Sequence, residues 1–344
     1  MSDAETLIRR EGRLGRITLN RPAALNALSL GMIEAIDGAL AAWEHDPQIA
    51  AVLIDGAGPR GLCAGGDIRV MQENVRSGAA ERPDRYLAIE YAMNARIAAF
   101  PKPYVAFMDG IVMGGGVGVS AHGSVRIVTE RTRLAMPEVG IGFLPDVGGT
   151  WLLSRAPGEL GTHAGLTGTI LTAFDAIACG LADHHVTSER LDRLAASLRD
   201  CDDAASVARI VAEQASPPDR AGFAAEPDWI AACYRHDEAE RIVAALKTHA
   251  DPAAREAAAR IEAVCPMSVV VTLRALRLAR GLGSLSACLA LEHHLAAGLI
   301  RRPDFVEGVR AALIDKDRTP SWRPGRLSEI DRTECDRLFA GVQS

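Results

Sequence analysis

The first half of the chain alternates short apolar runs with segments whose apolar residues recur at helical spacing. Continuous apolar runs, such as residues 49–55 and 104–108, are typical of strands buried on both faces. Residues 25–45 carry apolar side chains three and four positions apart, which predicts an amphipathic helix. The predicted strands are residues 15–20, 49–55, 104–108, 125–129 and 133–135, and the predicted helices are residues 25–45, 67–75, 86–100 and 114–122.

After about residue 200 the pattern changes, because strand-like runs largely vanish and helical patterns rich in Ala, Arg and Glu replace them. Proline and glycine in residues 216–227 predict an exposed connection, and Asp251-Pro252 and Cys265-Pro266 predict helix boundaries. Alternating strands and helices followed by helices alone predict an α/β fold. We expect a catalytic core over residues 1–200 and a mainly helical C-terminal region over residues 201–344.

Composition narrows the class of protein. The chain has 344 residues, of which 48% are hydrophobic, so a sizeable core is expected. A net charge of −6 argues against nucleic acid as a partner. Seven cysteines without a CxxC spacing indicate reduced thiols. The polar, acidic N-terminus and the lack of long apolar runs then predict a soluble cytoplasmic protein with no membrane partner.

Two glycine-rich stretches, LCAGGDIR from Leu62 and MGGGVG from Met113, are the first candidate site. A backbone without side chains can approach a ligand closely, and two converging N–H groups stabilise a negatively charged oxygen. Two other interpretations remain open. The small residues could allow close packing of a helix on a strand, or Gly116 and Gly118 could belong to a dinucleotide-binding fingerprint. Against the fingerprint, Gly116 lies eight residues beyond the predicted strand.

Two carboxylates, Glu138 and Asp146, lie within the segment MPEVGIGFLPDVGG. Apolar or small neighbours flank Glu138, and such surroundings raise the proton affinity of a carboxylate, as acid/base catalysis requires. The alternatives are a plain surface charge for Glu138 and a helix N-cap for Asp146. The sequence contains no GxSxG elbow, and no cysteine lies in a setting that marks it as a nucleophile. Acyl chemistry would therefore depend on the carboxylates.

Histidine pairs at 184–185 and 293–294 raise the question of a metal site. Adjacent residues on a helix point in different directions, and the i, i+4 pair of His185 and Glu189 offers only two ligands. We therefore predict no metal. For Asp67, at the start of a predicted helix, we expect a capping role.

These motifs resemble the crotonase (enoyl-CoA hydratase/isomerase) superfamily, whose N-terminal signature also resembles RPAALNAL from Arg21. The resemblance implies a crotonase-like spiral of ββα turns with a mainly helical C-terminal region. It also implies that the backbone N–H groups of Gly66 and Gly115 bind the oxygen of an acyl-CoA thioester. Hydratases of the superfamily use two glutamates, and the chain has Gly118 where the first is expected.

Within the superfamily the chain resembles the 3-hydroxyisobutyryl-CoA hydrolase family, including the stretch FVEGVRAALIDKDRTPSW from Phe305. This implies hydrolysis of 3-hydroxyisobutyryl-CoA in valine catabolism, with Glu138 as the catalytic carboxylate, Asp146 assisting, and Glu90, Gly115, Glu138 and Asp146 at the substrate. No cofactor is implied, since CoA is part of the substrate, and a homo-oligomer is compatible with the family. The alternatives are an enoyl-CoA isomerase or hydratase and a non-catalytic acyl-CoA-binding relative.

Overall fold

The computed structural model describes residues 4–79 and 81–342, which group into two compact units. Each unit is assembled from three separate segments of the chain. The division that the sequence predicts, a catalytic core over residues 1–200 and a helical region over residues 201–344, is a functional one and stays a prediction. The first unit comprises residues 4–66, 89–135 and 170–225, and the second comprises residues 67–79, 81–88, 136–169 and 226–342.

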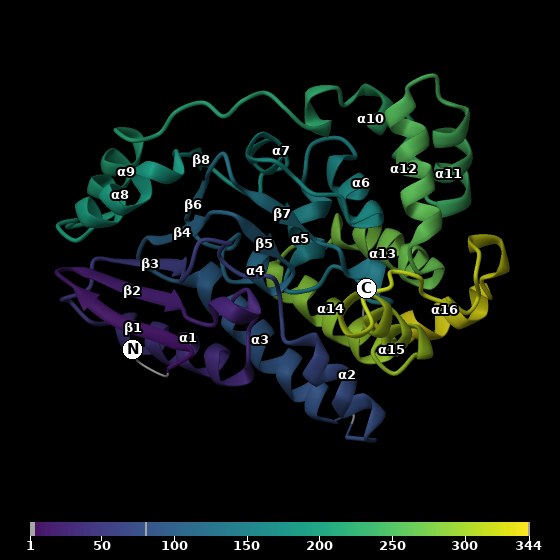
Figure 1. The fold of residues 1–344 in the computed structure, drawn as a ribbon, viewed down its shortest axis with the longest axis horizontal. Helices are drawn as coiled ribbons and strands as arrows, with labels where there is room; N and C mark the ends of the chain where they lie inside the picture. Colours follow the sequence, from purple (N-terminus) through teal and green to yellow (C-terminus); the bar gives the residue numbers. More distant parts are fainter. Residues whose placement is uncertain (1–3, 80, 343–344) are drawn as a thin grey trace. The chain divides into compact units, whose positions relative to one another are not determined.

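A six-stranded sheet forms the centre of the first unit as described, with the order β1-β2-β3-β4-β6-β8 (Figure 1). The first two strands form an antiparallel hairpin, and every later pairing in the sheet is parallel. The apolar runs predicted as buried strands are β3 and β4, whose side chains are almost all buried. The strands are β1 (Thr6–Glu11), β2 (Leu14–Leu19), β3 (Ala51–Gly56), β4 (Tyr104–Met108), β6 (Val125–Val128) and β8 (His184–His185).

Two shorter strands, β5 (Ile111–Met113) and β7 (Arg133–Ala135), form a separate parallel pair in the same unit. Each follows a strand of the main sheet after a few residues, so the strand–strand pattern of the predicted ββα turns is present. The helices and 3₁₀ turns of this unit are η1 (Pro22–Ala24), α1 (Leu30–Trp43), α4 (Gly115–Gly118), α7 (Ala173–Ala178), η3 (Ser188–Arg190), α8 (Leu191–Leu198), α9 (Ala204–Ala212) and η4 (Phe223–Ala225).

Mostly small and branched apolar side chains of the sheet and of two helices form a buried cluster, in a chain of which only 4% of the residues are aromatic. The sheet contributes side chains such as Leu14, Leu53 and Val105, and α8 and α9 contribute Leu194 and Val207.

Two predicted helices in the first unit are shorter than expected. The helix predicted from residue 25 begins at Leu30, because Leu25 and Asn26 adopt left-handed conformations and Ser29 caps the helix by accepting the Met32 N–H at 3.2 Å. The helix predicted over residues 114–122 is the four-residue α4. A high glycine content weakens helix propagation, which explains the early end.

Helices dominate the second unit, and every named element after His185 in the described chain is helical, which confirms the predicted change of character. Asp251 and Cys265 occupy the N-cap positions of α12 and α13, each followed by proline, as predicted. The elements are α2 (Ile68–Arg76), η2 (Glu138–Ile141), α5 (Gly149–Ser154), α6 (Leu160–Thr167), α10 (Asp228–Tyr234), α11 (Ala239–Thr248), α12 (Pro252–Ala263), α13 (Pro266–Ala279), α14 (Leu285–Leu299), α15 (Pro303–Val309), the π-helical turn η5 (Arg310–Ile314), η6 (Leu327–Glu329) and α16 (Arg332–Phe339).

The helix α3 (Glu81–Ala99) contributes residues to both units. Asp67 lies at the N-cap position of α2, as predicted, but its side chain makes no capping hydrogen bond to the helix. The connection predicted over residues 216–227 contains the chain boundary between the units, after Ala225.

Candidate active site

The segment that carries Gly65 and Gly66 runs alongside β5 in the first unit. Cys63 donates its N–H to the Ile111 carbonyl at 3.1 Å, and Met113 donates its N–H to the Cys63 carbonyl at 2.9 Å. Gly65 has a φ of +114°, a conformation that L side chains rarely adopt. The two glycine-rich stretches, about fifty residues apart in the chain, are therefore neighbours through strand-like pairing.

The signature RPAALNAL supports the same segment from its other side. Leu28 donates its N–H to the Gly65 carbonyl at 2.9 Å. The Asn26 side chain is buried and donates to the carbonyls of Ala57 and Gly61, each at 3.1 Å. The signature thus has a structural role, because it holds the loop that leads to Gly66.

Gly115 and Gly66, the two predicted oxyanion donors, lie next to each other. A methyl group placed on Gly115 would lie 3.2 Å from the Gly66 nitrogen, 3.1 Å from Leu28 Cδ1 and 2.8 Å from Glu90 Oε1. The first unit therefore brings together three predicted site residues, Gly66, Gly115 and Glu90. The Glu90 carboxyl is buried beside the two amides.

The next glycine in the loop has a different role. A methyl group on Gly116 would lie 2.5 Å from the Cys63 carbonyl oxygen, so this glycine allows α4 to pack directly on the first glycine segment. Close packing, one of the alternatives that the sequence left open, is thus the role of Gly116, whereas the oxyanion role of Gly115 beside the Gly66 amide stays a prediction. The geometry disfavours a dinucleotide fingerprint, because α4, the helix that follows the glycine turn, has only four residues.

The thiol of Cys63 lies beside this loop and accepts the Gly65 N–H at 3.4 Å. Cys63 is fully buried, and burial raises its pKa to about 12. A thiol with so high a pKa stays protonated at neutral pH and makes a poor nucleophile. All seven cysteines are free and buried, as the sequence predicted for reduced thiols.

Glu138, in the second unit, is the first residue of η2 and is only 6% exposed. It lies in the turn that follows β7 after two residues, and its burial shows that the surface-charge alternative is wrong. Contacts with remote helices hold the turn: Cys265 donates its N–H to the Val139 carbonyl at 3.1 Å, and the rings of Phe143 and Phe305 lie 5.8 Å apart.

The C-terminal stretch that begins at Phe305 packs against η2. A methyl group on Gly308 would lie 2.5 Å from the Ile141 carbonyl carbon, and one on Gly142 would lie 2.5 Å from the Asp304 carbonyl oxygen. Only residues without a side chain permit these approaches. The stretch whose sequence resembles the hydrolase family thus supports the segment that carries Glu138.

Asp146 is also 6% exposed, but it is not the helix N-cap that the sequence offered as an alternative. The α5 helix begins at Gly149, and Gly148 occupies the N-cap position with a φ of +81°. Val147, between Asp146 and this cap, has a φ of +52°. The turn after Pro145 consists of two successive left-handed residues, which place Asp146 one turn before the helix.

A residue that the sequence analysis missed supplies the cap instead. Glu292 of α14 is completely buried and accepts hydrogen bonds from the Gly148 N–H at 2.7 Å and the Thr150 N–H at 2.8 Å. Burial raises the pKa of the Glu292 carboxyl to about 8, and the negative charge of Asp146 contributes in the same direction. The bonds from Thr150 and Gly148 oppose that shift, because they favour the charged form.

A pattern in the sequence could have revealed Glu292. It is the one acidic residue among the apolar positions of α14, and its helical neighbours Cys288, Leu289, Leu295 and Ala296 are all buried. A charge inside an apolar stripe is rarely buried unless it has partners. In this helix the sequence pattern suggested only the adjacent histidines, 293 and 294, as candidates for chemistry.

The other candidate ligands are scattered. His184 and His185 form the short strand β8 instead of lying on a helix. Across residues 4–79 and 81–342, no group of three or more His, Cys, Asp or Glu side chains could hold a metal ion. The sequence prediction of no metal and no cofactor stays a prediction.

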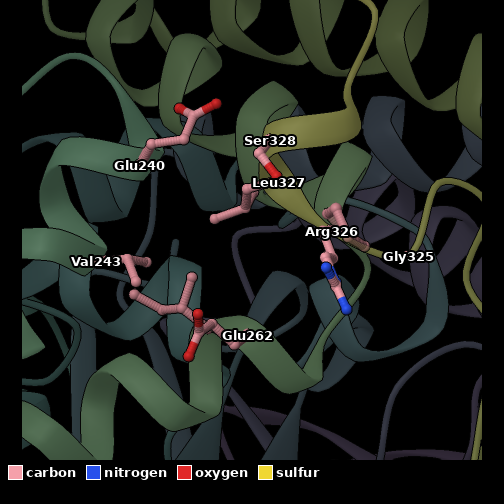
Figure 2. Close-up of a pocket in the computed structure, with 9 residues that line it drawn as sticks. Glu240, Val243, Glu262, Gly325, Arg326, Leu327 and Ser328 are labelled. Carbon is pink, nitrogen blue, oxygen red and sulfur yellow. The ribbon is translucent and has the colours of Figure 1, made fainter.

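A cavity of about 440 Å³ lies elsewhere in the second unit, between α11, α12 and η6 (Figure 2). Its two carboxylates are already in ion pairs, Glu240 with Arg332 and Glu262 with Lys247. The rest of the lining is mixed, with apolar side chains such as Val243 and Leu327 beside the polar Arg326 and Ser328. None of the predicted site residues lines this cavity as described, so we assign it no step of the reaction.

A family model described as enoyl-CoA hydratase/isomerase matches residues 14–339. This match covers nearly the whole chain and agrees with the sheet, the glycine loops and the helical C-terminal region described above. The chain belongs to the enoyl-CoA hydratase/isomerase family. The predicted crotonase-like α/β fold is confirmed.

Two curated relatives resemble this chain along almost its whole length. The chain is 40% identical to rat "3-hydroxyisobutyryl-CoA hydrolase, mitochondrial", over 99% of this chain and 90% of the relative. It is 39% identical to the human protein of that name, over 99% of this chain and 89% of the relative.

Two solved structures of the family share the fold along their full length. One is a carnitinyl-CoA dehydratase from Mycobacterium thermoresistibile, with a TM-score of 0.93 and 46% identity over 99% of this chain and 98% of that one. The other is an enoyl-CoA hydratase from Rhodobacter sphaeroides 2.4.1, with a TM-score of 0.90 and 40% identity over 98% and 97%. The relatives thus carry names of different reactions on acyl-CoA thioesters.

Proposed function

We propose that this chain is an acyl-CoA thioester hydrolase that converts 3-hydroxyisobutyryl-CoA and water to 3-hydroxyisobutyrate and CoA, as in valine catabolism. The observation that carries the proposal is the distribution of carboxylates. One short segment holds two buried acids, Glu138 and Asp146, whereas α4 ends in Gly118, where hydratases of the superfamily carry a glutamate. The names of the curated relatives support the same reaction.

The oxyanion half of the mechanism is a pair of backbone amides. In the proposal, the N–H groups of Gly66 and Gly115 donate to the thioester carbonyl oxygen and stabilise the charge that develops there. Their adjacency in the first unit supports this role. Losing one such donor typically costs about 10²–10³ in rate. Glu90, buried beside the amides, would bind the hydroxyl end of the substrate.

The carboxylate half has two chemically balanced routes. In one, a Glu138 oxygen attacks the carbonyl carbon, the C–S bond breaks, CoA leaves as a thiol after taking a proton, and water hydrolyses the mixed anhydride. In the other, Glu138 takes a proton from a water molecule whose oxygen attacks the same carbon; the C–S bond then breaks, and CoA leaves as a thiol with the proton that Glu138 returns. Asp146 would orient Glu138 or the water, or bind the 3-hydroxyl group. Turnover in H₂¹⁸O identifies an anhydride that opens at the glutamate carbonyl, since heavy oxygen then enters Glu138.

Release of free CoA, followed with a thiol reagent, tests the proposal directly. We expect rapid release from 3-hydroxyisobutyryl-CoA and from 3-hydroxypropionyl-CoA, with crotonyl-CoA inert. Hydration or double-bond migration of an enoyl-CoA without thiol release would overturn the proposal.

The second candidate is an enoyl-CoA hydratase or isomerase, and the titles of the two solved structures favour it. In an isomerase, Glu138 alone would move a proton along the acyl chain, so Gly118 does not oppose it. A third candidate, an acyl-CoA-binding protein without catalysis, would bind acyl-CoA tightly and turn over none. The substrate panel above separates all three.

We propose further that the enzyme acts on its acyl-CoA substrate without a cofactor, a nucleic acid or a membrane, and that it forms a homo-oligomer in the cytoplasm. Among the described helices, none is long and apolar enough to cross a bilayer. The relatives named above are called mitochondrial, so location needs its own test. Cell fractionation and light scattering would measure location and oligomeric state.

A further inference from the structure

The buried glutamate of α14 contacts the chain immediately after Asp146. Glu292 Oε2 accepts the Gly148 N–H at 2.7 Å, and Oε1 accepts both the N–H of Thr150 at 2.8 Å and its hydroxyl at 2.5 Å. Glu292 and Thr150 are each 0% exposed. One side chain therefore binds three donors of a three-residue segment, out of reach of solvent.

These bonds replace a local helix cap. The first N–H groups of a helix have no partner within it and are usually satisfied by a Ser, Thr, Asp or Asn at the N-cap. The N-cap of α5 is Gly148, which has no side chain. Glu292, from a helix more than 140 residues later in the chain, serves that purpose.

The segment that these bonds hold is conformationally strained. Val147 is β-branched and has a φ of +52°, which is unfavourable for such a side chain. Strained residues persist only where surrounding contacts hold them, and they concentrate at functional sites. Val147 joins Asp146 to Gly148, and the Asp146 carbonyl accepts the Gly149 N–H at 2.6 Å. The direction of the Asp146 side chain thus depends on a turn whose far end Glu292 holds.

We propose that Glu292 is a positioning residue for the reaction: by binding Gly148 and Thr150 it holds the strained Asp146-Val147 turn and so sets the direction of the Asp146 carboxyl group. This inference rests on the proposed function, in which Asp146 assists Glu138. Glu292 is not among the site residues that the sequence predicted, which are Gly66, Glu90, Gly115, Glu138 and Asp146.

The replacement Glu292→Gln tests the role with a minimal change of volume. A carboxyl group offers an acceptor on each oxygen, whether it is ionised or protonated, whereas an amide offers an acceptor on one atom only. The introduced amide would therefore leave either the Gly148 or the Thr150 N–H facing an NH₂ group. We expect kcat for thioester hydrolysis to fall roughly tenfold to a hundredfold. KM should change less than about threefold, since the change affects the reacting geometry more than binding.

Asp175 of the first unit provides a matched control. It is 1% exposed and binds an equivalent set of donors: the N–H and hydroxyl of Thr172, each at 3.0 Å, and the Ala224 N–H at 2.9 Å. Asp175→Asn removes an acceptor from the same kind of clamp at the start of α7. We expect a loss of thermal stability similar to that in Glu292→Gln, with kcat unchanged.

Thr150 gives a second test should Glu292→Gln fold poorly. Thr150→Val removes the hydroxyl donor at nearly constant volume, and Thr150→Ser keeps it. We expect Thr150→Val to lower kcat several-fold and Thr150→Ser to restore most of it. Equal kcat values for wild type, Thr150→Val and folded Glu292→Gln would overturn the proposal, as would an equal fall in Asp175→Asn.

Hydrogen exchange of the peptide covering residues 143–152 separates this inference from the proposed function. Glu292→Gln should lose protection at Gly148 and Thr150, and Asp175→Asn should retain it. If wild type releases no thiol from any acyl-CoA, the proposed function fails on that result alone, while exchange still shows whether Glu292 holds the turn. Unchanged exchange in Glu292→Gln would overturn the positioning role itself.

Discussion

The two sets of site residues are held by different physical means. In the first unit, Gly66 and Gly115 are placed by backbone pairing of neighbouring strand-like segments, and the role proposed for them uses their backbone N–H groups. In the second, Glu138 and Asp146 are side chains on irregular turns, held by contacts with α13, α14 and α15. The geometry of the first set should therefore change when a methyl group is added to one of the two glycines themselves. The geometry of the second set should change when a residue far away in the chain is replaced.

The largest expected effect comes from removing the acid/base function while keeping its shape. Glu138→Gln should lower kcat by about 10²–10⁴, because a general base or nucleophile is lost, while acyl-CoA still binds. Stopped-flow thiol release measures kcat, and calorimetric titration with an acyl-CoA measures binding. Glu256→Gln, the same change at an exposed position of α12, should leave both unaltered. Normal turnover in folded Glu138→Gln would eliminate the catalytic role.

A methyl group in the oxyanion hole should have the next largest effect. Gly115→Ala would place Cβ 3.2 Å from the Gly66 nitrogen and 2.8 Å from Glu90 Oε1, within the space proposed for the substrate oxygen. We expect kcat/KM to fall by about 10²–10³ with the fold retained, since the closest atom ends a side chain that can shift.

The control for that change is Gly38→Ala. A methyl group there, on the exposed face of α1, has no neighbour within 4 Å. It should leave kcat/KM unchanged and raise stability by about 0.5–1 kcal/mol, because alanine favours the helix. Full activity in Gly115→Ala would show that the amides do not bind the reacting oxygen.

Asp146→Asn should have a smaller effect on turnover. If Asp146 orients Glu138 or water by a charged hydrogen bond, its loss should cost about 1.5–3 kcal/mol, or roughly ten- to a hundredfold in kcat. Comparing 3-hydroxyisobutyryl-CoA with isobutyryl-CoA sharpens the assignment. A fall confined to the hydroxylated substrate would assign Asp146 to the 3-hydroxyl group, and an equal fall with both would assign it to Glu138 or the water.

The smallest effect concerns stability and pH. Burial raises the pKa of Glu292 to about 8 in the folded protein, above its ordinary value, so the folded state binds a proton more tightly than the unfolded state. The stabilisation of the folded protein by this proton is greatest at pH values below the pKa of Glu292 in the unfolded chain. It is lost as pH rises toward 8, and the free energy of unfolding then falls by at most about 1.4 kcal/mol per pH unit. Melting temperatures between pH 5 and 8.5 should fall less steeply in Glu292→Gln. Parallel curves for the two proteins would contradict this expectation.

Much of the architecture could be predicted from local patterns. Continuous apolar runs identified β3 and β4, and proline after Asp251 and Cys265 identified the starts of α12 and α13. Local patterns failed where backbone conformation was unusual. Because Leu25 and Asn26 are left-handed, α1 begins later than predicted. The left-handed Val147 and Gly148 separate Asp146 from α5, so the alternative of a helix N-cap at Asp146 is wrong. Such conformations depend on distant partners, which a local pattern does not contain.

The sequence by itself identified the chemical groups of the candidate site: glycines whose backbone a ligand can approach closely, and two acids in an apolar segment. Its resemblance to a family also predicted the fold. Only the tertiary structure decided which glycine does what, since Gly115 borders the Gly66 amide and Gly116 packs on Cys63. It also revealed Glu292, because a buried charge is explained by its partners, and those partners lie more than 140 residues away in the chain. Hydrogen bonds and packing join residues by distance in space, and chain position alone does not specify that distance.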